Sequence, residues 1–133
     1  MNFSSPTLKP EQKNAYQGEI YRSEKGMEFI KPEKWKGKVE ISEDVDSIIF
    51  NYVMIPNKKI FVFKIKTWSH EDYEKNKQDI PKQYIIGKNK QYVFDLITAI
   101  DVEMDFEESQ KYIDDFTSMI IPVQEIIERT AIR

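Results

Sequence analysis

The chain has 133 residues, enough for one domain with a single core. Its 20 Lys and Arg stand against 23 Asp and Glu, and this net charge of −3 disfavours a nucleic-acid-binding protein, which needs surplus positive charge. The absence of cysteine excludes disulfides and cysteine-ligated metals, and the single histidine excludes a two-histidine metal motif. No run approaches the ~18 apolar residues of a membrane-spanning helix.

Residues 1–18 are predicted to form a flexible N-terminal tail, and residues 19–133 a single folded domain. The tail carries Pro6 and Pro10 among polar residues and has no apolar period. Such a segment buries too little apolar surface to offset the entropy lost on ordering. No secretory apolar stretch follows the first residue, so we expect any export signal to have been removed already.

Four strand-like runs follow the tail. Alternation of apolar and polar residues predicts strands at 27–30 and 38–41. Branched and aromatic residues predict two more, at 47–54 and 60–66, and the turn chemistry of residues 56–59 joins these two into a hairpin.

A helix and a second hairpin come next. Ser69 is a good N-cap, and Glu71 and Asp72 follow where the helix dipole favours negative charge, so we predict a helix over 70–78. Residues 82–86 and 91–97 then form strands around a turn containing Gly87.

The last third is predicted to be helical. Asp105 and Glu108 have the spacing of a capping box, and apolar residues then recur at three- and four-residue intervals. Pro122 either kinks this helix or starts a second one, and an apolar face continues to near the end. The order β-β-β-β-α-β-β-α-α predicts an α+β fold, with an antiparallel twisted sheet of about six strands and helices packed on it.

Candidate catalytic residues are few. His70 can in principle act as a general base, but helix capping explains its neighbours Ser69 and Asp72, and no nucleophile motif is present. The four glycines are scattered and form no phosphate-binding loop. We therefore expect a non-enzymatic protein that uses no cofactor.

An acidic run at residues 101–108 has carboxylates at alternate positions, as calcium loops do. Phe106 stands where an EF-hand needs glycine, and Tyr112 where it needs glutamate, so the run is not an EF-hand. An extended segment with its carboxylates in solvent explains the pattern. A weak divalent-ion site stays open as an alternative, and we predict no metal centre.

Charge is unevenly distributed along the chain. Residues 1–90 hold 17 basic and 13 acidic groups, whereas residues 91–133 hold 3 and 10. This asymmetry predicts an acidic patch that attracts a cationic partner, although ordinary solvated helix charge also explains it. The predicted ligand-binding patch comprises Asp101, Glu103, Asp105, Glu107, Glu108, Tyr112, Asp115 and Phe116.

Lysines flank Trp35 and occupy the predicted hairpin turns. Such residues either rest on an anionic bilayer or keep sheet edges from pairing. We interpret Trp35 itself as a plug at the end of the sheet. Lys9 and Lys13, in the tail, are predicted to lie near the membrane surface.

Two stretches carry family resemblances. The segment YRSEKGMEFIKPEKWKGKVEI, residues 21–41, resembles the opening of small α+β domains of the PsbP-like type. The polar leader, the Lys- and Asn-rich cysteine-free domain and the segment DVEMDFEESQKYIDDF, residues 101–116, are similar to lantibiotic self-immunity lipoproteins of Gram-positive bacteria, of the subtilin type.

The second resemblance implies a domain held outside the cytoplasmic membrane by an N-terminal lipid, and we expect this domain to be a monomer. Such a protein gives antimicrobial resistance to its producer by intercepting a cationic, pore-forming peptide. The sequence departs from the pattern because it lacks the cysteine that carries the lipid, and no binding residues transfer position by position. The first resemblance implies the alternative, a structural or assembly module that binds another envelope protein.

Overall fold

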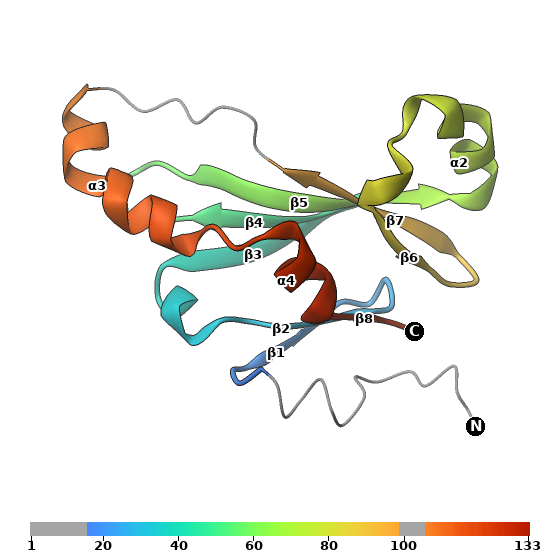
Figure 1. Cartoon of the computed structure of the whole chain (residues 1–133), viewed down its shortest axis with the longest axis horizontal. Helices are drawn as coiled ribbons and strands as arrows, with labels where there is room; N and C mark the ends of the chain where they lie inside the picture. The colour runs from blue at the N-terminus through green and yellow to red at the C-terminus, as the bar shows by residue number, and fades with distance from the viewer. Residues whose placement is uncertain (1–15, 99–105) are drawn as a thin grey trace.

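The computed structural model describes residues 16–98 and 106–133, and in these residues the chain forms two antiparallel sheets and three helices (Figure 1). The smaller sheet has the strand order β1 (Ile20–Arg22), β2 (Met27–Ile30), β8 (Thr130–Ile132). The larger sheet has the order β3 (Val39–Asp44), β4 (Ser47–Tyr52), β5 (Ile60–Ser69), β7 (Tyr92–Thr98), β6 (Ile85–Lys88). The predicted α+β class is confirmed.

The helices begin at the signals that the sequence carries. Helix α2 (His70–Asn76) starts at Ser69, whose Oγ accepts the Asp72 amide at 3.1 Å, as predicted. Helix α3 (Phe106–Met119) ends shortly before Pro122, which is the N-cap of a separate helix α4 (Val123–Glu128). One-turn 3-10 helices occur at η1 (Glu33–Trp35), η2 (Lys77–Asp79) and η3 (Lys82–Tyr84).

The prediction of one sheet with about six strands was wrong, because eight strands in two sheets are present among the described residues. The missed strands, β1 and β8, have three residues each, too few to show a period. Both pair with β2, and Met27 of β2 lies opposite Ile132 of β8. Because of this long-range pairing, residues 130–132 form a strand, whereas the apolar pattern predicts that the last helix continues to near the end of the chain.

The core lies between the two sheets, on what we call the inner face of the five-stranded sheet. Phe50 of β4 stacks on Phe63 of β5 at 4.2 Å, and Phe29 of β2 meets Phe50 edge-on at 5.2 Å. Trp35 stacks on Phe29 at 5.6 Å and is 2% exposed, which confirms its structural role. Its Nε1 donates to the Met119 carbonyl at 2.7 Å and so fastens the end of α3.

Helix α3 is also held to the large sheet by a polar contact. Asp115 accepts hydrogen bonds from Lys38 Nζ at 2.6 Å and from Tyr52 OH at 2.7 Å. Beside it, Phe116 packs edge-on against the Tyr52 ring at 5.5 Å. The hydrogen bond from Lys38, and to a smaller extent that from Tyr52, lowers the pKa of Asp115 below its usual range.

The opposite, outer face of the large sheet is only partly covered. Ile49, Lys64 and Ile97 share this face by their cross-strand pairing, and each is half-buried. At the N-terminal end of the described chain, Tyr16 lies within the expected tail, and it donates to Glu128 and packs under the Arg129 guanidinium.

We expect Asp115→Asn to lower the free energy of unfolding by about 1 kcal/mol at pH 7, because charge-assisted hydrogen bonds are lost. The carboxylate has a lowered pKa in the folded protein, so its stabilisation exists above the unfolded pKa of about 3.9 and disappears as pH falls through the folded pKa. Urea unfolding from pH 7 to 3 measures this. The exposed Asp114→Asn is the matched control, and equal losses in both variants would contradict the assignment.

Candidate functional site

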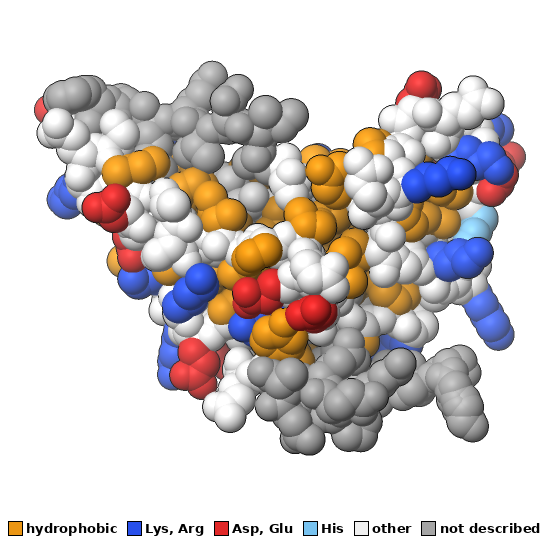
Figure 2. Space-filling view, in the orientation of Figure 1, with side chains coloured by type: hydrophobic (Ala, Val, Ile, Leu, Met, Phe, Trp, Pro, Cys, Tyr) orange, Lys and Arg blue, Asp and Glu red, His pale blue; other side chains and the backbone are white. Residues whose placement is uncertain are grey.

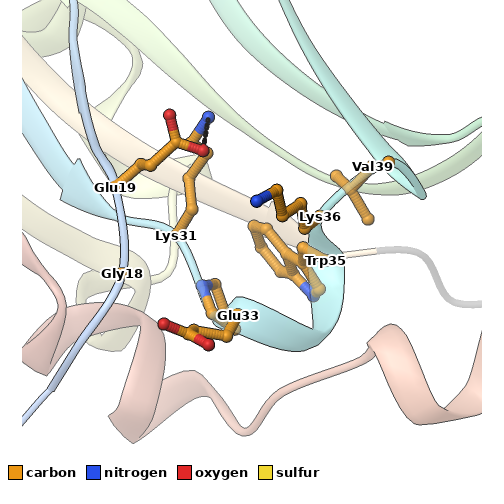
Figure 3. Close-up of a pocket in the computed structure, with 9 residues that line it drawn as sticks. Gly18, Glu19, Lys31, Glu33, Trp35, Lys36 and Val39 are labelled. Carbon is orange, nitrogen blue, oxygen red and sulfur yellow. Dashed lines mark ion pairs between the residues drawn. The ribbon is translucent and has the colours of Figure 1, made fainter.

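A pocket beside Trp35 is the first candidate (Figure 3). It has a volume of about 220 Å³ and lies between the start of β1 and the turn after η1. Glu19 and Lys31 form an ion pair across it at 4.0 Å, as the dashed line in Figure 3 shows. Trp35 is committed to the core and leaves almost no ring surface for a ligand. The charges are therefore balanced within the pocket, and the aromatic wall serves packing.

A second pocket, of about 430 Å³, lies on the outer face beside α2, and we call it the α2 pocket. Figure 2 shows hydrophobic side chains lining a hollow in this region. Strand β5, the turns after α2 and the end of β7 supply its walls, with the lining residues Trp68, Asn76, Asp79, Ile80, Pro81, Tyr84, Asp95, Leu96, Ile97 and Thr98.

The α2 pocket contains a buried carboxylate. Asp95 is 6% exposed, and its Oδ2 accepts one hydrogen bond, from Trp68 Nε1 at 3.1 Å. An ionised carboxylate has about four acceptor positions, so most of its capacity is unused by the described residues. Burial raises the pKa of Asp95 above its usual range, against the opposing effects of Trp68 and Lys66. A buried, perturbed acid in a pocket is a mark of a functional site.

The cationic residue opposite Asp95 in the sheet has an aromatic contact of its own. Lys66 lies opposite Asp95 in the β5–β7 pairing, but its Nζ sits over the Trp68 ring at 4.2 Å from the centroid. Asp79 adds a second carboxylate at the pocket wall, and Ile80, 7% exposed, adds an apolar surface. The pocket therefore offers negative charge within an apolar and aromatic surround, which suits a ligand with a cationic group on an apolar body.

The predicted acidic patch is described only in part. Asp101, Glu103 and Asp105 lie outside the described residues, as does the side chain of Glu108. Lys9 and Lys13 of the predicted membrane-proximal segment are also outside.

The other members of that patch lie on α3. Glu107 is exposed, and Tyr112 is half-buried with Lys111 Nζ 5.4 Å from its ring centroid. Asp115 is engaged by Lys38 and Tyr52. Phe116 is 1% exposed, so its predicted contact with a surface ligand is wrong: the side chain belongs to the core.

His70 has a local structural contact. The exposed imidazole lies at the start of α2, and its Nε2 is 2.7 Å from the Asn89 carbonyl oxygen, to which the Nε2–H form donates. This contact joins α2 to the turn between β6 and β7.

Within residues 16–98 and 106–133, no group of three His, Asp or Glu side chains is placed to hold a metal ion. The helices in these residues are too short and too polar to cross a bilayer. Comparison of the chain with protein-family models, with curated proteins and with solved structures finds no match.

We expect Asp95→Asn to raise the thermal stability at pH 7. Burial raises the folded-state pKa of Asp95, so its favourable contribution exists below the unfolded pKa and is lost as pH rises through the folded pKa. The amide oxygen can still accept from Trp68. The gain should vanish near pH 3, as followed by circular dichroism melts. Trp68→Phe, which removes the donor, should destabilise instead; a loss of stability in Asp95→Asn at pH 7 would contradict the argument.

Proposed function

We propose that this chain is a non-enzymatic binding domain that captures a cationic amphipathic peptide, and that the α2 pocket receives one of its cationic side chains. The observation that carries the proposal is Asp95: a carboxylate 6% exposed, with one hydrogen-bond donor, in a pocket walled by Trp68 and Tyr84.

The physical basis is the cost of leaving a charge buried. A buried carboxylate is unfavourable until a cation or further donors compensate it. An ammonium or guanidinium group in the pocket pairs with Asp95, while the stem of that side chain packs against Ile80 and Ile97. Binding thereby removes part of the unfavourable free energy of the uncompensated Asp95 carboxylate, and this gain contributes to the affinity.

The acidic run supports the same ligand from the sequence. Thr98 lines the α2 pocket, and the run that starts at Asp101 follows three residues later along the chain. Residues 91–133 hold 10 acidic and 3 basic groups, a distribution that steers a cationic ligand toward this part of the protein.

The resemblance to lantibiotic self-immunity lipoproteins supplies the biological setting of the proposal. In that setting the ligand is a cationic lantibiotic, and the domain intercepts it at the outer face of the cytoplasmic membrane of a Gram-positive cell. An N-terminal lipid would hold the domain there.

A second candidate function has an observation of its own. Ile113 and Ile120 lie seven residues apart on or just after α3 and are 39% and 49% exposed. An apolar helix surface of this kind favours a protein partner, as expected of a PsbP-like assembly module in the cell envelope.

Isothermal titration calorimetry of the full chain with a subtilin-type lantibiotic tests the first function. We expect Asp95→Asn to weaken binding at least about tenfold, which corresponds to about 1.4 kcal/mol. The exposed Asp114→Asn removes the same charge elsewhere and should change affinity less than about twofold. Acetylating the lysines of the peptide should weaken its binding as much as Asp95→Asn does. Unchanged affinity both for the Asp95→Asn variant and for the acetylated peptide would exclude the α2 pocket as the binding site.

The acidic run has its own test. Changing Asp101, Glu103, Asp105 and Glu107 to their amides should slow association and reduce its salt dependence, because steering acts on the encounter rate. Stopped-flow measurement at two salt concentrations separates this effect from the Asp95 effect, which should appear in the dissociation rate. Identical association rates for the two proteins would remove the steering role.

A further inference from the structure

The turn between β6 and β7 is fixed by one side chain. Asn89 Nδ2 donates to the carbonyl oxygens of Lys25 and Arg133, at 3.0 and 2.9 Å. Its Oδ1 accepts the amides of Gln91 and Tyr92, at 2.9 and 2.8 Å. All hydrogen-bonding positions of the amide group are thus used, and they join the turn to both sheets.

Close packing at two glycines holds the end of β8 against β6 and against the turn between β1 and β2. A Cβ at Gly87 of β6 would lie 2.8 Å from Cγ1 of Ile132, so only glycine allows this contact. Gly26 has φ +100°, and a Cβ there would lie 2.7 Å from the Arg133 carbonyl oxygen. The backbone that carries Lys88, Lys90 and Arg133 is therefore fixed before any ligand arrives.

These three cationic residues share a shallow pocket of about 640 Å³, which we call the basic pocket; its lining residues are Lys88, Asn89, Lys90, Gln91, Ile132 and Arg133. None of the three forms an ion pair with an acid among the described residues. The charge of Lys88 contributes to the lowered pKa of Glu74, but the ion pair of Glu74 is with Lys77, at 2.8 Å. Figure 2 shows lysine and arginine side chains gathered beside the histidine at this end of the molecule.

We propose that the basic pocket binds the phosphate of an anionic phospholipid headgroup, so that the β6–β7 turn rests on an anionic bilayer. Three unpaired cations around one depression suit a phosphate. Ile132 and the aliphatic lysine stems form an apolar lining, which favours an amphipathic anion over a free phosphate ion. The whole chain has a net charge of −3, so the attraction has to be local.

This inference does not need the peptide ligand, but it has a consequence for the α2 pocket. Helix α2 is joined to the β6–β7 turn through His70 and Asn89, and β7, which follows that turn, lines the α2 pocket. A domain resting on this turn would hold the α2 pocket near the bilayer surface.

Cosedimentation of the full chain with vesicles tests the proposal. We expect binding to vesicles with about one-third phosphatidylglycerol and none to pure phosphatidylcholine. The triple variant Lys88→Gln, Lys90→Gln, Arg133→Gln should bind the anionic vesicles at least about tenfold more weakly, since each cation near the surface contributes about 1 kcal/mol. The matched control Lys34→Gln, Lys36→Gln, Lys59→Gln has the same net charge and should lose less than about threefold.

Equal losses in the two triple variants, or no binding by the wild type, would overturn the proposal. Adding inorganic phosphate or glycerol phosphate distinguishes the source of the phosphate: release of the protein from the vesicles at millimolar concentration would assign the pocket to a soluble phosphate instead. Lantibiotic binding by the basic-pocket variant in the absence of vesicles should equal that of the wild type, so this test and that of the proposed function fail independently.

Discussion

The fold depends on Trp35, because this one side chain contacts both sheets and the end of helix α3. Its ring stacks on Phe29 of the small sheet and packs against Phe50 and Phe63 of the large sheet. Its Nε1 donates to the carbonyl oxygen of Met119 and fixes the end of α3. A buried indole needs a partner for its N–H, and here that partner is a helix-terminal carbonyl that would otherwise lack one. One residue thus satisfies the packing of two sheets and the polar requirement of a helix end.

This arrangement makes the two faces of the large sheet unequal. The inner face is closed by the small sheet and the core, whereas the outer face keeps a pocket with a carboxylate in its wall. There Asp95 is buried by the turns after α2 without full compensation, which costs stability. Proteins retain such destabilising residues where ligand binding offsets the loss of stability, and we therefore propose the ligand site on the outer face. In the basic pocket, by contrast, the side-chain amide of Asn89 uses all its hydrogen-bonding positions, so this turn contains no comparable destabilising group.

The sequence contained a signal for the candidate site that the charge pattern obscured. In β7, Phe94 and Leu96 lie on one face, and Val93 and Ile97 lie with Asp95 on the other. A strand that is apolar on both faces is covered on both, so its single carboxylate is expected to be buried. The acidic run at residues 101–108 indicates where charge accumulates along the chain, but it carries no information about burial. Trp68, the donor to Asp95, stands 27 residues earlier, and only the β5–β7 register brings the two together.

Local patterns were enough to predict the α+β class, the N-cap at Ser69, the strands β2 to β5 and β7, and a buried Trp35, because each depends on neighbours within a few residues. The strand predicted at 82–86 lies at 85–88 instead, so that Gly87 belongs to β6 and not to the turn. Strand β8 and the division into two sheets required tertiary structure, since β2 pairs with residues about 100 positions away. Strand β1 pairs with β2 locally, but its three residues are too few to show a period. The burial of Phe116 also required the tertiary structure, because the helical period places this residue on an apolar face of α3 but does not show what covers that face. Periodicity records which side of an element is apolar. Only the packed structure decides which apolar surfaces meet, which carboxylate is enclosed, and which cations remain unpaired.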